Sequence, residues 1–135
     1  MRCHIMLVVV AGTVALAAGC HKKPTEGGVR LEQVSDAFAS AGLKVADFKP
    51  ADAAPFNAQK CVAGQVERLD TVVCEYGSPE AVALGKKAGE QWAVGATTAA
   101  VLGNGRTILA VADRQMADPN GKTIHKITQA FTHVR

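Results

Sequence analysis

The chain has 135 residues, which is enough for one domain and too few for two. Its formal net charge of +3 comes from 15 basic and 12 acidic residues that are interspersed along the sequence. The sequence therefore lacks the clustered basic stripe that nucleic-acid binding requires, and we expect no nucleic-acid partner. Aromatic residues make up only 4% of the chain, so we expect a core packed largely from small side chains.

Residues 1–20 (MRCHIMLVVVAGTVALAAGC) have the pattern of a secretory signal. Arg2 supplies a positive start, and the run from Ile5 to Ala18 contains no charged residue. This run is shorter than the roughly 20 residues that a membrane-spanning helix needs, and polar residues follow it closely. The segment therefore predicts export and not a membrane span.

The residues ALAAGC, which end at Cys20, resemble the lipobox of bacterial lipoproteins, which reads Leu, small, small, Cys. This sequence has Ala17 where the family usually has Leu, a replacement that the pattern tolerates. The resemblance covers only the signal and Cys20. It implies cleavage after Gly19, a diacylglycerol on the Cys20 thiol and acylation of the new amine.

We therefore divide the chain into a signal peptide (1–19), a lipidated cysteine with a flexible polar tether (20–29) and a single domain (30–135). More than one acyl chain gives a stable anchor, so the expected lipid partner of Cys20 is a membrane. We expect a cell-envelope location, at the outer membrane or the outer face of the cytoplasmic membrane, with the domain in the periplasm or outside the cell. The competing interpretation is plain secretion, with Cys20 incidental.

Cys61 and Cys74 are the two cysteines that remain after the signal and Cys20 are set aside. An even remainder in an exported domain favours a disulfide. If a turn centres near residues 67–68, two strands bring Cys61 opposite Cys74. Such a bridge closes about 14 residues and stabilises by roughly 3 kcal/mol in the chain-entropy model. A metal pair or a redox pair is the alternative, but close ligand spacing and Cys-x-x-Cys are both missing.

The domain begins with a predicted helix over residues 30–41, capped by Gly42, because apolar residues recur there at helical spacing. Residues 43–48 predict a short strand that Pro50 ends. Residues 49–60 predict a loop with two prolines, and residues 61–76 predict the hairpin that contains the two cysteines.

Ser78, followed by Pro79, predicts the start of a second helix that ends near Trp92. The apolar runs 97–102 and 106–113 predict a second hairpin, with a type I′ turn at Asn-Gly. A last helix is predicted from Asp118, with one buried stripe of apolar residues: Ile124, Ile127, Phe131 and Val134.

The predicted fold is therefore an α+β domain in the order α-β-ββ-α-ββ-α. We expect a five-stranded, mostly antiparallel sheet, because the strands form hairpins. We expect the helices to pack on one face of this sheet.

No pattern in the mature sequence indicates catalysis, a cofactor or a metal. The residues ADPNGKT (117–123) contain Gly-Lys-Thr, but a phosphate-binding loop needs a glycine where Met116 stands. A calcium loop in the same place lacks its terminal carboxylates. His125 and His133 share a helix face but lie about 12 Å apart along the axis, too far for one ion.

These observations favour a lipid-anchored, non-catalytic binding or accessory module of the cell envelope, with an envelope protein as partner. The candidate surfaces are a sheet face left uncovered by helices and the proline loop 49–60. The alternatives are an envelope hydrolase, which would need His125, His133, Asp113 or Asp118 around a cleft, and a protein that binds a small ligand or a metal.

Overall fold

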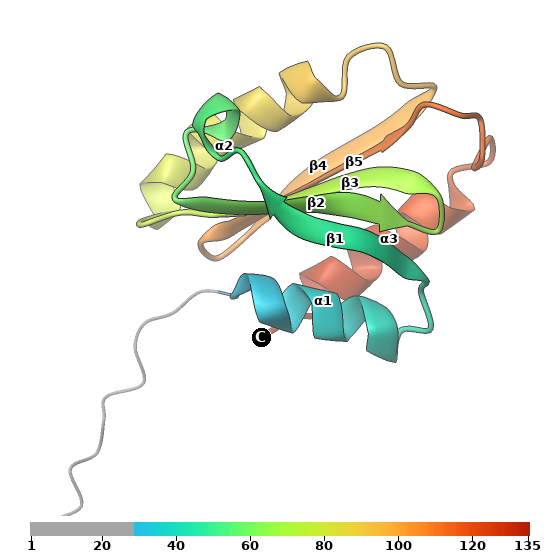
Figure 1. Cartoon of the computed structure of the whole chain (residues 1–135), viewed down its shortest axis with the longest axis horizontal. Helices are drawn as coiled ribbons and strands as arrows, with labels where there is room; N and C mark the ends of the chain where they lie inside the picture. Colours follow the sequence, from blue (N-terminus) through green and yellow to red (C-terminus); the bar gives the residue numbers. More distant parts are fainter. Residues whose placement is uncertain (1–28) are drawn as a thin grey trace, which may run out of the picture.

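The computed structural model describes residues 29–135, so the signal segment and Cys20 lie outside the described residues. The described chain forms one antiparallel sheet in the order β1-β2-β3-β5-β4 (Figure 1). None of its helices is long and apolar enough to cross a membrane. The elements are α1 (Leu31–Ser40), β1 (Val45–Ala51), the 3-10 helix η1 (Ala54–Phe56), β2 (Lys60–Val66), β3 (Leu69–Glu75), α2 (Pro79–Trp92), β4 (Thr98–Asn104), β5 (Thr107–Asp113) and α3 (Lys122–Thr132).

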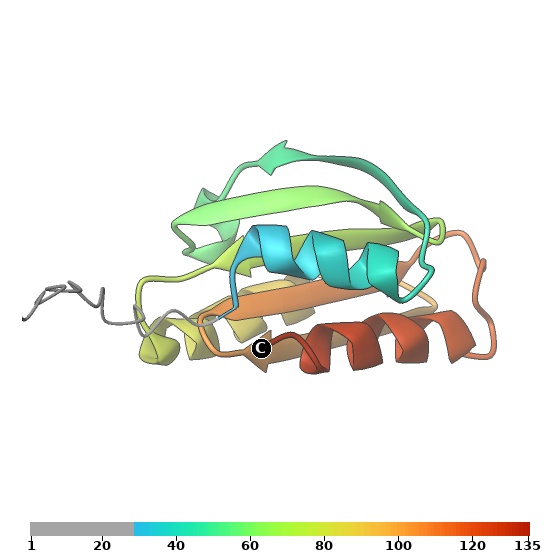
Figure 2. The same cartoon turned by 90° about the horizontal axis from the view of Figure 1, so that it is seen from below.

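Helices cover both faces of this sheet. α1 and α3 pack side by side on one face, and α2 packs on the other (Figure 1 and Figure 2). The predicted α+β class, the five antiparallel strands and the order of the elements are confirmed. The prediction that the helices share one face is wrong.

The two-sided burial of β3 and β5 explains this arrangement. Leu69 and Val73 of β3 belong to the core under α1 and α3, whereas Val72 and Cys74 belong to the core under α2. Every residue of β5 is buried. Strands buried on both faces read as continuous apolar runs, because both sets of alternating side chains must be apolar.

The hairpin of β2 and β3 has the predicted turn. Glu67 and Arg68 both have positive φ, at 51° and 70°, as a type I′ turn requires. The register then pairs Cys61 with Cys74, and the two cysteines form a disulfide. Val66 and Leu69 close the turn as a hydrogen-bonded pair. Hydrogen-bonded and non-hydrogen-bonded pairs alternate along the ladder, so Cys61 and Cys74 form a non-hydrogen-bonded pair. In such pairs the two Cα atoms lie closer together.

The hairpin of β4 and β5 differs from its prediction by one residue. Asn104 pairs with Thr107, so the turn consists of Gly105 and Arg106, and only Gly105 has positive φ. The expected type I′ turn at Asn-Gly is therefore not formed. The Asn104 side-chain amide instead donates hydrogen bonds to the carbonyls of Phe131 and Val134, at 2.9 and 3.0 Å. These bonds fix the hairpin to the end of α3.

The prediction that Pro50 ends the first strand is wrong, because β1 continues to Ala51. β1 is an edge strand, and at an edge every second residue directs its N–H to solvent. Lys49 and Ala51, on either side of Pro50, pair with β2 at positions directed toward that strand. Pro50 therefore lies where its missing N–H costs no ladder hydrogen bond.

α2 lies close to the sheet because small residues face the strands. The Ser78 side chain accepts a hydrogen bond from the Ala81 N–H, which confirms the predicted helix start. A Cβ at Gly85 would lie 2.0 Å from the Tyr76 hydroxyl oxygen, and one at Gly89 would lie 2.9 Å from Val101 Cγ1. A larger residue at Gly85 would collide with Tyr76, and one at Gly89 would push α2 away from β4.

We predict that Cys61→Ala with Cys74→Ala lowers the free energy of unfolding by about 3 kcal/mol, because the bridge restricts the unfolded chain. Urea unfolding of oxidised wild-type protein and of the double variant measures this difference. Thiol labelling of native protein should also find both cysteines blocked until reduction. Free thiols at Cys61 and Cys74 in native protein would contradict the bridge.

Candidate functional site

The disulfide is a structural element and not a reactive centre. Cys61 and Cys74 are buried beneath α2 and η1, with 2% and 0% of their surfaces exposed. Cys20, the predicted lipidation site, lies outside the described residues. Within residues 29–135, no group of three or more His, Cys, Asp or Glu side chains is placed to hold a metal ion.

Asp113 and Asp118, the two carboxylates that a hydrolase would need, instead stabilise the loop between β5 and α3. Asp113 is fully buried and accepts hydrogen bonds from the N–H groups of Gln115, Ala117 and Asp118, at 2.8 to 3.1 Å. Asp118 accepts the Ile124 N–H at 2.8 Å and so caps the first turn of α3. Both carboxylates are therefore occupied by backbone groups.

The pKa of Asp113 reflects this role. Burial acts to raise the pKa of the carboxyl, but the surrounding backbone N–H groups outweigh burial and hold it below its ordinary value. His125 on α3 and His133 directly after α3 are both exposed, and neither joins the two aspartates in the hydrogen-bond network of the loop.

The loop over residues 49–60 is largely a packing element. Its first residues extend β1, and Phe56 of η1 is buried in the core under α2. The Tyr76 hydroxyl donates a hydrogen bond to the Phe56 carbonyl at 2.9 Å. Burial raises the pKa of Tyr76 to about 12, so this hydroxyl keeps its proton at neutral pH. The loop therefore closes the core and offers little free backbone.

The two edges of the sheet differ sharply in how they are protected. β1 carries Pro50, Lys49 and a bulge between Ala46 and Lys49, with Asp47 at a φ of 56°. Proline, lysine and bulges are the features that keep edge strands from pairing with other chains. β4 has the sequence TAAVLGN, which contains no charge and no proline. β4 also pairs with β5 in an unbroken register.

The free backbone groups of β4 belong to three residues. Asn104 and Thr107 close a two-residue turn and so form a hydrogen-bonded pair. The alternation of the ladder then directs the N–H and C=O groups of Ala99, Val101 and Gly103 away from β5 and toward solvent. These groups form a ready template for one more strand.

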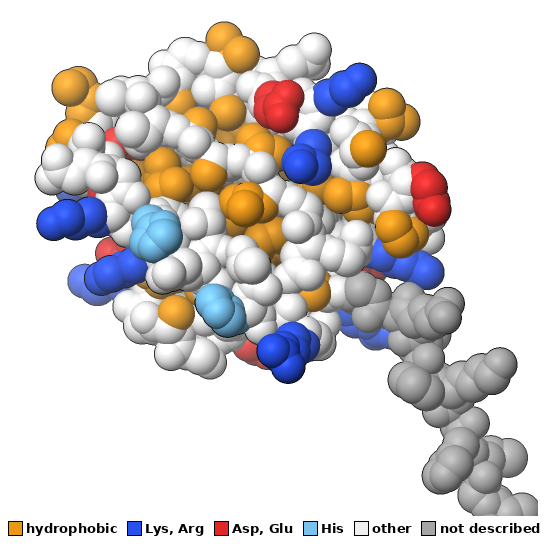
Figure 3. Space-filling model, turned by 180° about the vertical axis from the view of Figure 1, so that it is seen from behind, with side chains coloured by type: hydrophobic (Ala, Val, Ile, Leu, Met, Phe, Trp, Pro, Cys, Tyr) orange, Lys and Arg blue, Asp and Glu red, His pale blue; other side chains and the backbone are white. Residues whose placement is uncertain are grey.

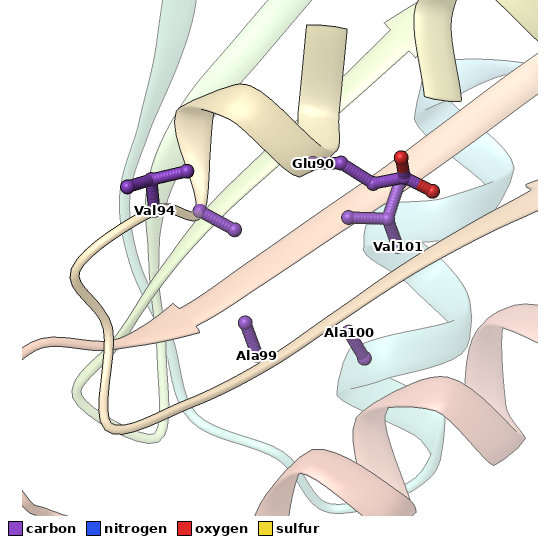
Figure 4. Close-up of a pocket in the computed structure, with 6 residues that line it drawn as sticks. Glu90, Val94, Ala99, Ala100 and Val101 are labelled. Atoms are coloured by element: carbon purple, nitrogen blue, oxygen red, sulfur yellow. The ribbon is translucent and has the colours of Figure 1, made fainter. Parts of the chain in front are cut away.

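A shallow hollow of about 310 Å³ lies beside this edge, between β4 and the end of α2 (Figure 4). In Figure 4, Ala99 and Val101 point toward α2, and the Glu90 side chain reaches over Val101. Val94, at the outer wall, has 75% of its surface exposed. The space-filling view of this side shows an apolar band across the middle of the molecule (Figure 3).

Arg114 holds the α2 wall of this hollow in place. Its guanidinium donates hydrogen bonds to the carbonyls of Trp92 and Val94 at the end of α2, the second at 3.2 Å. The same group lies 5.1 Å from the centre of the Trp92 ring and 3.5 Å from an Asp70 carboxylate oxygen. These contacts join α2 to β3 and β5, so the hollow is bounded by fixed elements.

A second hollow, of about 570 Å³, lies on the outer face of α3. It is lined by polar and basic residues: Asn120, Gly121, Lys122, His125, Lys126 and Gln129. The lysines are exposed and belong to one helix, so this hollow has the character of a solvated helix face. The β4 edge is therefore the more specific candidate.

Sequence reasoning did not find this edge, because the strand order was not predicted. The available signal was the contrast between Lys49-Pro50 in one strand and the uncharged TAAVLGN in another.

Comparisons with protein-family models, curated protein sequences and solved structures give no match to this chain.

We predict that the free energy of unfolding falls more steeply with decreasing pH in the wild-type protein than in Asp113→Asn. A carboxyl whose pKa is lower in the folded state contributes stability above its unfolded pKa of about 3.9 and loses it as pH falls through the folded pKa. Urea unfolding of wild type and Asp113→Asn between neutral pH and about pH 3 measures the difference. Equal pH slopes in the two proteins would show that Asp113 does not anchor the loop.

Proposed function

We propose that this chain is a lipid-anchored envelope protein that acts without catalysis, by binding an extended segment of a protein partner along β4. The observation that carries this proposal is the unprotected edge at Ala99, Val101 and Gly103, beside an apolar hollow. An exposed edge of neutral residues is an aggregation hazard, which natural proteins remove unless the edge has a use. This chain protects β1 and leaves β4 open.

The edge and the hollow supply different parts of recognition. Backbone hydrogen bonds to the added strand give affinity, and every second side chain of that strand turns toward α2 and meets the hollow. The walls at Ala93, Val94 and Val101 favour small or branched apolar side chains there. Glu90 favours a basic or hydrogen-bond-donating group at the rim.

Lipid attachment at Cys20 fits this role. The segment between Cys20 and the first described residue, Val29, is short and polar, so an anchored domain would act close to the bilayer. Confinement at a surface raises the local concentration of any partner in the same membrane, which favours a weak edge contact.

The test is photo-crosslinking in intact cells that express the full chain. Val94 is replaced by a benzoyl-phenylalanine probe, because its side chain is exposed beside the hollow. We expect one dominant protein adduct in the membrane fraction. Ala99→Pro should abolish the adduct, because it removes one outward N–H while sparing the bonds to β5, as Pro50 does on β1.

The matched control places the same probe at Leu84, which is exposed on α2 but does not line the hollow. Formation of the Cys61–Cys74 disulfide reports that each variant folds. Cys20→Ser should move the protein out of the membrane fraction. Equal adducts from Val94 and Leu84, or an adduct that survives Ala99→Pro, would contradict strand addition at β4.

A further inference from the structure

The side of α2 that borders β4 carries small and charged residues at positions symmetric about residue 88, and the two charges have opposite signs. Ala83, Lys86, Glu90 and Ala93 recur at helical spacing, with one alanine and one charge on each side of residue 88. Two of these residues, Lys86 and Glu90, lie beside β4. A Cβ at Gly103 would lie 3.7 Å from Lys86 Cδ, and Glu90 lines the hollow over Val101.

β4 has the same kind of symmetry. Its outward-directed residues are Ala99, Val101 and Gly103, with the larger side chain at the centre and small ones on both sides. The centres of the two elements coincide in space, because a Cβ at Gly89 would lie 2.9 Å from Val101 Cγ1. One two-fold axis can therefore pass close to the midpoints of both β4 and α2.

We propose that the strand added at this edge is β4 of a second copy of this chain. In this assembly Val101 lies opposite Val101 of the second copy, and Ala99 lies opposite Gly103 of the second copy. Each pair exchanges backbone hydrogen bonds, so the two sheets join into one. The inference rests on the proposed function and names the partner of the same edge.

The two copies of α2 then run antiparallel beside each other. α2 lies over β4 and β5, so the two helices are separated by about two strand spacings, or about 10 Å. This is close to the distance at which helices pack. Lys86 of each copy then faces Glu90 of the other, while the alanines at both ends leave room for the approach.

On the opposite face of the sheet, α3 is the helix that packs against β4. Lys126 of α3 lines a hollow together with Ala41, at the end of α1, and so lies on the side of α3 away from β4. A two-fold axis perpendicular to the sheet also keeps α1 of both copies on the same face. Both chains therefore enter their domains from one face, which suits two lipid-anchored copies on one bilayer.

The test exchanges the facing charges in the full chain that carries the Val94 probe. Lys86→Glu places like charges opposite each other at two related positions, and Glu90→Lys does the same. We expect each single variant to reduce the adduct between two copies by about fivefold. The double variant, Lys86→Glu with Glu90→Lys, restores opposite charges and should recover the adduct.

A mixture gives a sharper result. Cells that express the Lys86→Glu chain and the Glu90→Lys chain, with different tags, should form the mixed adduct at near wild-type yield while each chain alone forms little. A merely structural effect of either charge would not be rescued in this way. The matched control is Lys87→Glu, because Lys87 is exposed on α2 but neither lines the hollow nor lies beside Gly103.

The outcomes separate this inference from the proposed function. Adducts between two copies that follow the charge pattern establish the second copy as the partner. An adduct with a different protein that depends on Ala99 but not on Lys86 or Glu90 overturns the second copy and leaves strand addition standing. No adduct dependent on Ala99 overturns both.

Discussion

Every open sheet ends in two strands whose outer N–H and C=O groups have no partner, and this chain treats its two ends in opposite ways. β1 has a proline, a lysine and a bulge, so it offers no regular row of backbone groups. β4 has none of these features, and its unbroken pairing with β5 keeps the outward groups of Ala99, Val101 and Gly103 in line. The binding proposal depends on this contrast.

The rest of the structure holds β4 straight and in place. β5 is buried on both faces and gives β4 a rigid neighbour. Asn104 fixes one end of the β4–β5 hairpin to the end of α3, and Arg114 fixes the end of α2 over the other end of β4. Small residues such as Gly89 let α2 approach closely, which forms the apolar hollow beside the edge.

Local signals in the sequence predicted much of this fold. The turn at Glu67 and Arg68, the pairing of Cys61 with Cys74 and the Ser78 cap each depend on a few neighbouring residues. The class and the order of elements follow from such signals. They follow because hairpins and amphipathic helices are encoded within short segments.

Long-range relations were not predictable in the same way. The order β1-β2-β3-β5-β4 places the later hairpin with β5 inside and β4 outside, and no local pattern specifies that choice. The placement of helices on both faces was readable in principle, because LDTVVCE and TILAVAD are apolar runs without alternation. The type I′ turn predicted at Asn104 is wrong, because the Asn104 side chain hydrogen-bonds to the end of α3 and Asn104 lies outside the turn.

Whether the β4 edge is occupied in the working protein is the central question, and residue-resolved hydrogen exchange of the full chain in membranes answers it. The Leu102 amide points toward β5 and serves as the protected reference. With a partner strand on β4, the Val101 amide exchanges about as slowly as the Leu102 amide, and Ala99→Pro makes the Val101 amide exchange quickly. Fast exchange at Val101 beside slow exchange at Leu102 in the wild-type chain would show a free edge and contradict the account.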